Sequence, residues 1–137
     1  MFYLYSLTFK LDRAIMQVEK ILKFNQAFNQ ESDSNLAIDQ LDLLFKKNMY
    51  DIHDLLFSYH YTKRERVYDI ILNKEDFIYS NGRGSFLAKY MIGFFNGCAD
   101  LDFNNTEKMK ITFSVDFKND TVLLIGEYIP DEEQHEI

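Results

Sequence analysis

The side chains best suited to bind a metal or transfer a proton are the three histidines, His53, His60 and His135. Asp51 lies two positions before His53, a spacing that on a strand directs both side chains to one face, as metal ligands require. In a helix, His53 and His60 would share a face because they are seven positions apart. Neither arrangement supplies the full ligand set of a zinc site, and the chain has one Cys. The sequence therefore predicts no metal and no cofactor, and leaves His53 and His60 as ligand candidates.

The segment "NGRGS", which begins at Asn81, is the most motif-like passage. Gly82 and Gly84 are too close together for a P-loop, no Lys follows them, and the third glycine of a dinucleotide fingerprint is missing. The pattern predicts a turn at Asn81 and Gly82, with Ser85 as the N-cap of a following helix. Arg83 beside a helix N-terminus would attract an anion. Arg83 and Ser85 are therefore weak candidates for binding an anion or another ligand.

Nucleophilic catalysis is not indicated by the sequence. Carboxylates follow Cys98 in "CADLD", and nearby negative charge disfavours a reactive thiolate. No serine lies in a Gly-x-Ser-x-Gly elbow. The sequence leaves enzymatic activity open and favours a non-catalytic role.

One segment, "YHYTKRERVY" (59–68), interleaves basic and aromatic residues as single-stranded nucleic-acid binders do. Glu65 interrupts it, and on a strand Lys63 and Arg64 would point to opposite faces. The net charge of −7, from 15 basic and 22 acidic residues, repels a polyanion. Nucleic acid is therefore disfavoured as a partner, and Arg64 is kept as a weak ligand candidate.

Acidic side chains gather between residues 31 and 54. We expect a contact surface there, formed by Asp39, Asp42, Asp51 and Asp54. A negatively charged protein attracts a basic partner over a distance, which raises the association rate. The sequence therefore predicts a basic, toxin-like protein as the partner of these four aspartates.

Three functional hypotheses are consistent with this composition. The favoured one is a non-catalytic protein-binding module, of the kind represented by acidic bacterial immunity proteins and antitoxins that neutralise a basic, nuclease-like toxin. The second is a small enzyme or ligand-binding domain that uses His53, His60 and a nearby Arg. The third is a homo-oligomeric structural subunit in which the aromatic residues, 16% of the chain, bury one another across an interface.

Hydrophobic periodicity predicts the elements that would position these residues. Residues 2–10 are rich in aromatic and β-preferring side chains and predict a strand. Residues 11–28 and 35–47 carry apolar side chains at helical spacing. Asp33 or Ser34 is a suitable N-cap for the second of these helices.

From residue 48 to 77 the period is ambiguous between helix and strand. We expect extended structure around 55–62 and around 66–72. Residues 86–96 present a broad apolar face at helical spacing, which predicts a third helix after the "NGRGS" turn.

The C-terminal part alternates in the manner of a β-hairpin. Residues 109–117 place apolar and polar side chains on opposite faces, "KND" (118–120) is typical of a turn, and residues 121–129 return as a second strand. Pro130 ends that strand. The last residues, 131–137, are mostly acidic and predict a loose tail.

The whole chain, residues 1–137, is expected to form one α+β domain. Its antiparallel sheet would contain the N-terminal strand and the C-terminal hairpin, covered by about three helices. A single Cys indicates a reducing compartment, and no apolar run reaches the length of a membrane helix. The N-terminus lacks the pattern of a signal peptide, so we expect a cytoplasmic protein without membrane partners.

Overall fold

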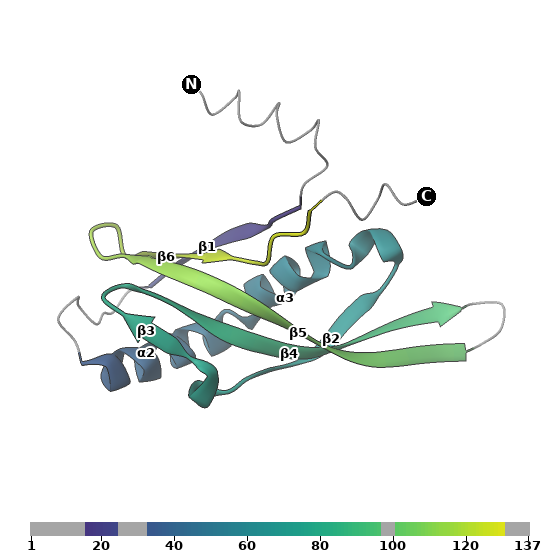
Figure 1. Ribbon diagram of the computed structural model, residues 1–137, viewed down its shortest axis with the longest axis horizontal. Helices are drawn as coiled ribbons and strands as arrows, with labels where there is room; N and C mark the ends of the chain where they lie inside the picture. Colours follow the sequence, from purple (N-terminus) through teal and green to yellow (C-terminus); the bar gives the residue numbers. More distant parts are fainter. Residues whose placement is uncertain (1–15, 25–32, 97–100, 131–137) are drawn as a thin grey trace, which may run out of the picture.

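The computed structural model describes residues 16–24, 33–96 and 101–130 of the 137-residue chain. Its elements, in chain order, are β1 (Glu19–Lys23), α2 (Ser34–Lys47), α3 (Met49–Ser58), η1 (Tyr61–Lys63), β2 (Arg66–Leu72), η2 (Lys74–Asp76), β3 (Ile78–Ser80), β4 (Arg83–Asn96), β5 (Leu101–Asp116) and β6 (Thr121–Ile125). The elements η1 and η2 are single turns of 3₁₀ helix. The long strands β4 and β5 pair along their whole length and run through the middle of the molecule (Figure 1).

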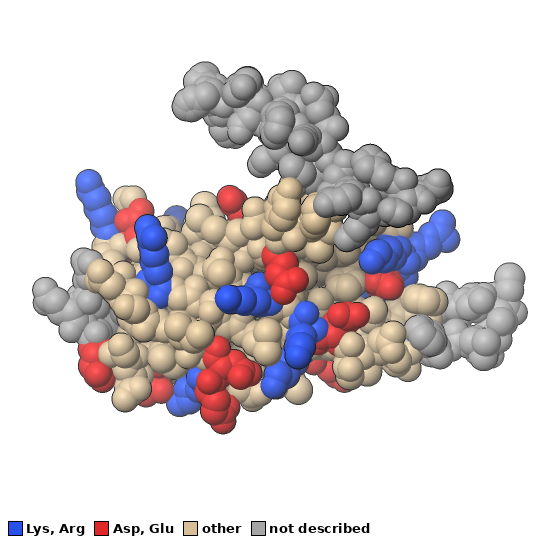
Figure 2. Space-filling model, in the orientation of Figure 1, with Lys and Arg blue, Asp and Glu red and all other residues tan. Residues whose placement is uncertain are grey.

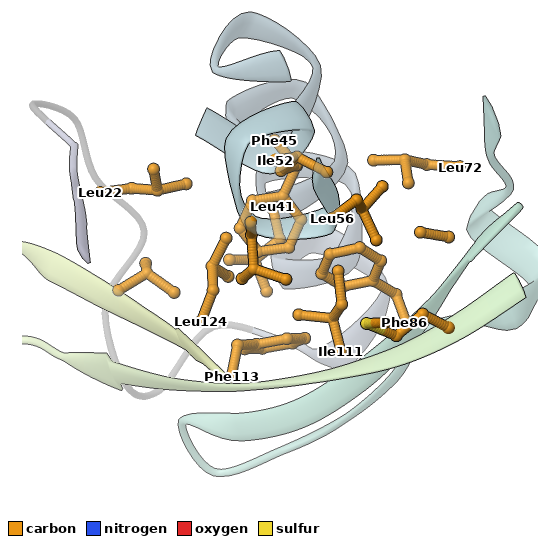
Figure 3. Close-up of a cluster of buried hydrophobic side chains, with 14 of the residues drawn as sticks. Leu22, Leu41, Phe45, Ile52, Leu56, Leu72, Phe86, Ile111, Phe113 and Leu124 are labelled. Atoms are coloured by element: carbon orange, nitrogen blue, oxygen red, sulfur yellow. The ribbon is translucent and has the colours of Figure 1, made fainter. Parts of the chain in front are cut away.

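The strands form one antiparallel sheet in the order β1-β6-β5-β4-β2, with β3 paired to β4 beside this path. The sheet is curled, and α2 and α3 pack on its inner face with the buried side chains between the two layers (Figure 3). The antiparallel sheet and the mixed architecture agree with the predicted α+β class. The described ranges contain two α-helices, where about three were expected.

Aromatic rings from both layers form the centre of the core. The ring of Phe45 in α2 lies 4.9 Å from that of Phe86 in β4 and 5.5 Å from that of Phe113 in β5, measured between centroids. Phe77 stacks against Phe86 at 5.3 Å. Each such pair adds about 0.5–1.5 kcal/mol beyond the burial of its surface. A large part of the aromatic content therefore stabilises the fold.

The alternation predicted for residues 109–117 is confirmed in β5. Met109, Ile111 and Phe113 are buried, with exposed fractions of 5%, 0% and 3%. Lys110 and Thr112 between them are exposed on the outer face. Successive strand side chains point to opposite faces, so this period fixes which face of the sheet receives the helices.

The turn between β5 and β6 confirms the predicted turn at residues 118–120. The Asp116 carboxylate accepts hydrogen bonds from the backbone N–H groups of Lys118 (3.0 Å) and Asn119 (3.1 Å) and from the Asn119 side-chain amide (2.8 Å). These bonds, above all that from the Asn119 side chain, lower the pKa of Asp116. Asp120 has a φ of 54°, a left-handed conformation that Asp tolerates better than most residues.

The predicted helix over residues 86–96 is wrong, because these residues belong to strand β4. Both faces of this strand carry apolar side chains: Phe86 is buried on the inner face, while Leu87 is half-buried on the outer face. Such a two-faced pattern is indistinguishable from a broad helical face when the pairing with β5 is unknown. The turn at Asn81 and Gly82 is confirmed, with φ of 50° and 89°. Ser85 is not a helix cap but a strand residue that is 8% exposed.

The predicted helix over residues 11–28 is also wrong where the structure describes it, because residues 19–23 form β1. This strand pairs with β6. Leu22 is buried, with an exposed fraction of 2%, whereas Ile21 is 66% exposed. The apolar residues also fit helical spacing, so the period alone selected the wrong element. Tertiary pairing overrides local propensity here.

Helix α2 confirms the prediction for residues 35–47, and Asp33 occupies its N-cap position. Extended structure around residues 55–62 is wrong, since α3 runs to Ser58 and η1 follows. Ile52, Leu55 and Leu56 are fully buried on one side of α3, a spacing that only a helix provides. Extended structure around 66–72 is confirmed as β2.

Three further predictions concern residues outside the described part of the chain: the strand at 2–10, the acidic tail at 131–137 with His135, and the surroundings of Cys98. Over the ranges that the structure covers, no helix combines the length and the apolar character needed to cross a membrane.

Candidate functional site

The four aspartates predicted as a contact surface do not form a common patch of free charge. Asp39 forms an ion pair with Lys74 (2.9 Å), and Asp54 lies 3.5 Å from the ammonium nitrogen of Lys20. Asp42 is 6% exposed and bonds Lys46 at 3.1 Å, one turn further along α2. An aspartate already paired with a lysine contributes less to the attraction of a partner. Asp51 at the start of α3 is in no ion pair with another described residue.

The outer surface mixes charges of both signs. Figure 2 shows Lys and Arg side chains interspersed with Asp and Glu over the face toward the viewer. A surface of this kind lacks the continuous basic stripe that tracks a nucleic-acid backbone. The expectation that nucleic acid is not the partner stays a prediction.

The histidines and arginines proposed as a ligand pocket are not brought together. His53 lies in α3 and lines a hollow against β2, whereas His60 lines a different cavity after the end of α3. Arg64 is exposed and has a left-handed φ of 63°. Arg83 is exposed at the start of β4, and neither hollow includes Arg64 or Arg83.

A row of aromatic side chains follows the outer face of α3 and continues onto β2; we call it the aromatic strip and define it as Tyr50, His53, Phe57, Tyr61 and Tyr68. Residues spaced by three and four lie on one face of a helix. The rings also touch one another: His53 stacks on Phe57 at 5.8 Å, and Phe57 meets Tyr61 edge-on at 5.8 Å. Tyr50 and Tyr61 are 76% and 64% exposed.

Three residues of the strip, His53, Phe57 and Tyr68, line a hollow of about 530 Å³ between α3 and the edge of the sheet. The Arg66 guanidinium lies over the Tyr68 ring at 5.7 Å, and the Tyr68 hydroxyl donates to the side chain of Asn104. His53 Nε2 donates to the backbone carbonyl of Val67 at 3.1 Å. This hydrogen bond satisfies one backbone acceptor of the edge strand β2. The carbonyl of Val67 is therefore not free to pair with an added strand.

The second cavity measures about 350 Å³. Hydrogen bonds link three of its lining side chains, Glu65, His60 and Tyr90, in a row that we call the relay. His60 is 8% exposed; its Nδ1 lies 2.7 Å from Glu65 Oε1 and its Nε2 lies 2.9 Å from the Tyr90 hydroxyl. A carboxylate only accepts hydrogen bonds, so we assign the proton of the neutral imidazole to Nδ1. Nε2 then accepts the hydroxyl proton of Tyr90.

Two tyrosines at this cavity are strongly biased toward the protonated form. Burial raises the pKa of Tyr90, and the negative charges of Glu107, Glu127 and Glu65 raise it further. Burial also raises the pKa of Tyr59, whose hydroxyl donates to the carbonyl of Glu127 (2.6 Å) and accepts from the N–H of Val18 (2.9 Å). Neither phenol is therefore suited to act as a base near neutral pH.

Neither Tyr90 nor Glu107 was found from the sequence, because both lie on strands whose pairing brings them to His60. Tyr90 was assigned to an apolar helix face, and Glu65 was noted only as an interruption of a basic segment. A contact between residues thirty positions apart leaves no local signal that periodicity could reveal. Among the residues the structure covers, no three of the His, Cys, Asp and Glu side chains cluster as metal ligands would.

Comparison of the chain with protein-family models, with curated proteins and with solved structures finds no match.

Proposed function

We propose that this chain is a non-catalytic protein-binding module of the immunity or antitoxin type, which captures a basic, toxin-like partner protein in the cytoplasm. The observation that carries the proposal is the aromatic strip, with Tyr50 76% and Tyr61 64% exposed. Tyr side chains are enriched at protein interfaces because they bury a large area while few bonds lose rotational freedom. Such tyrosines, at the two ends of the part of the aromatic strip that follows the firmly packed helix α3, are suitable anchors for a partner.

The rigidity of the strip supports the proposal. Ile52, Leu55 and Leu56 hold the opposite side of α3 in the core with no exposed surface. His53 and Phe57 stack on one another, so their rotamers are already restricted before a partner arrives. Preorganised contact residues lose little entropy on binding, which leaves more of the contact energy for affinity.

The charge on the α3 part of the strip supports a basic partner, whereas Arg66 lies over Tyr68 at the other end. The chain carries a net charge of −7, and Asp51 and Asp54 lie on α3 within the strip's own helix. Because Asp54 already forms an ion pair with Lys20, Asp51 is the carboxylate best placed to attract a positive charge. This narrows the predicted acidic surface from four aspartates to one principal residue.

The first experiment is a co-purification of the tagged chain from the organism that encodes it, with mass spectrometry of the bound proteins and light scattering of the complex. We expect a basic protein at equal stoichiometry. The double variant Tyr50→Ser, Tyr61→Ser should bind the purified partner at least roughly thirtyfold more weakly, since even one anchor residue at an interface contributes about 2 kcal/mol or more. The matched control is Tyr128→Ser, which removes a 53% exposed tyrosine outside the strip.

A second arm of this experiment tests the charge. Asp51→Lys should slow association with the partner, and the difference should shrink as salt is added. Asp39→Asn is the control, because Lys74 already neutralises Asp39. A chain that purifies alone would contradict protein binding as its function. A partner that binds the tyrosine variants and the control equally well would show that the contact surface lies elsewhere.

A further inference from the structure

The polar cavity beside His60 shares no lining residue with the hollow at the aromatic strip, and its lining groups are chemically different. It measures about 350 Å³ and is lined by residues from the link between α3 and η1, from η1, β4 and β5, and from the segments before β1 and after β6. Among them are Tyr59, His60, Tyr90, Glu107 and Glu127. Pockets of this size accommodate small molecules. Its wall combines aromatic rings with carboxylates.

The hydrogen-bond directions in the relay determine what the Tyr90 hydroxyl offers to the cavity. In the neutral tautomer assigned above, His60 Nδ1 donates to Glu65, and Tyr90 gives its only hydroxyl proton to His60 Nε2. Tyr90 is 4% exposed, so its position is fixed by the surrounding core. The lone pairs of its oxygen remain as acceptors. The relay therefore presents a hydrogen-bond acceptor, not a donor, at the buried end of the cavity.

Glu107 supplies a negative charge at the wall of the cavity. It pairs directly with Tyr90 across the β4–β5 ladder, and its side chain is exposed. No ion pair links Glu107 to another residue in the described part of the chain. Burial and the negative charges of Glu107, Glu127 and Glu65 all act to keep the Tyr90 phenol protonated. The potential at the Tyr90 oxygen is therefore negative.

Two lysines also border the cavity, Lys63 and Lys108. Lys108 follows Glu107 on β5, so strand alternation directs its side chain to the opposite, outer face. Lys63 lies on the exposed turn η1 at the rim. The acceptors of Tyr90 and Glu107 therefore determine the character of the interior.

We propose that this cavity binds the guanidinium or ammonium group of a small organic cation. Glu107 would pair with the positive charge, the Tyr90 oxygen would accept one of its N–H bonds, and the rings of Tyr59 and Tyr90 would add cation–π attraction. The same acceptors and negative potential exclude carboxylates and phosphates. This site is independent of the protein-binding function proposed above.

The test is a titration of the full chain with butylguanidinium, followed by calorimetry and by NMR of the tyrosine rings. Butylurea is the neutral control of almost the same shape. We expect saturable binding of butylguanidinium and roughly tenfold weaker binding of butylurea, because the charge-assisted bonds to Glu107 are lost.

Two variants locate the binding. Glu107→Gln keeps the shape of an exposed side chain and should weaken butylguanidinium binding roughly tenfold. Tyr90→Phe keeps the ring and removes the acceptor, which should weaken binding by a few-fold, on the order of one neutral hydrogen bond. Glu75→Gln in η2 is the matched control and should bind as the unaltered chain does, because Glu75 lies outside this cavity.

Three outcomes would overturn the proposal: no saturable binding of butylguanidinium, equal binding of butylurea, or a Glu107→Gln variant that binds as tightly as the Glu75→Gln control. Circular dichroism of each variant establishes that the fold is intact. None of these outcomes bears on partner capture by the aromatic strip, so the two proposals succeed or fail separately.

Discussion

At the scale of single residues, Gly84 in β4 lies close both to strand β3 and to a ring of the core. A Cβ atom built on Gly84 would lie 1.9 Å from the backbone carbonyl oxygen of Ile78 and 2.8 Å from Cζ of Phe113. The first of these atoms belongs to the paired strand β3 and cannot rotate away. The close pairing of β3 with β4 therefore depends on the absence of a side chain at this position.

We predict that Gly84→Ala lowers the free energy of unfolding by about 3 kcal/mol or more, because backbone must move to admit the methyl group. Urea denaturation measures this change. Arg83→Ala, an exposed neighbour on the same strand, is the control and should change stability by less than about 0.5 kcal/mol. Equal stability of the two variants would refute the observed packing of β3 on β4.

Local turn chemistry was predictable from single residues, whereas the meeting of distant polar groups was not. Asn81 and Gly82 indicated their turn because few other residues accept a left-handed conformation. The pairing of Asp39 with Lys74 and of His60 with Tyr90 depends on how α2, α3 and β4 pack. The candidate site depends on that packing. His60 could therefore be selected from the sequence, but its contacts with Glu65 and Tyr90 could not.

At the scale of elements, the edge strand β2 departs from regular geometry in its middle. Its register against β4 shifts between Tyr68 and Ile71, and Asp69 within the shift has a φ of 54°. A bulge of this kind increases the twist of an edge and discourages pairing with another chain. The bulge is thus a second obstacle to strand addition, beside the hydrogen bond from His53 to Val67.

We predict opposite effects for two substitutions at Asp69. Asp69→Val should lower stability by about 1–2 kcal/mol, because a β-branched residue is strained at positive φ. Asp69→Gly should leave stability unchanged or raise it by up to about 1 kcal/mol, because Gly adopts this conformation without strain. Thermal unfolding of the pair measures the difference. A Val variant as stable as the Gly variant would show that the strand is regular in solution.

The elements that could be predicted are those with one polar and one apolar face. α2 and residues 109–116 of β5 satisfy this condition, and their periods of 3.6 and 2 distinguish them. Strand β4 has apolar side chains on both faces, so its period resembled that of a helix. Strand β1 is too short for its period to decide between helix and strand, and its pairing with β6 settles the matter.

At the scale of the whole molecule, buried tyrosines couple stability to high pH. Tyr59, Tyr79 and Tyr90 are between 4% and 8% exposed, and burial raises the pKa of each above the ordinary value of 10.0. An acid with a raised pKa in the folded state keeps its proton longer than in the unfolded chain. The unfolded state therefore releases protons first, and its free energy falls relative to the folded state as pH rises.

We predict full stability below about pH 10 and a decline above it, of up to about 1.4 kcal/mol per pH unit for each tyrosine that is protonated only in the folded state. Urea denaturation between about pH 9 and pH 11 measures the slope. Tyr90→Phe should show a shallower slope than the unaltered chain, because one titrating group is gone. An identical slope would mean that Tyr90 titrates alike in both states.

The general class of the molecule was predictable because the elements identified correctly, helix α2 and the C-terminal hairpin, already imply an antiparallel sheet combined with a helix. Its function was not, because no motif fixes a reaction and charge alone does not identify a surface. The aromatic strip could not be predicted, because it requires the helix α3 where the sequence predicts extended structure around residues 55–62.

The pairing of β1 with β6 joins the two ends of the described chain, and this has a consequence for folding. Gln17 and Gly126, which share a hydrogen bond, are 109 positions apart. Contacts so distant in sequence form late and slow the folding reaction. On the ribosome, synthesis of the intervening residues takes about 5–20 s at common elongation rates. We therefore expect Leu22 to remain exposed to water throughout that interval, and the closure of β1 onto β6 to be the last step by which a nascent chain becomes native.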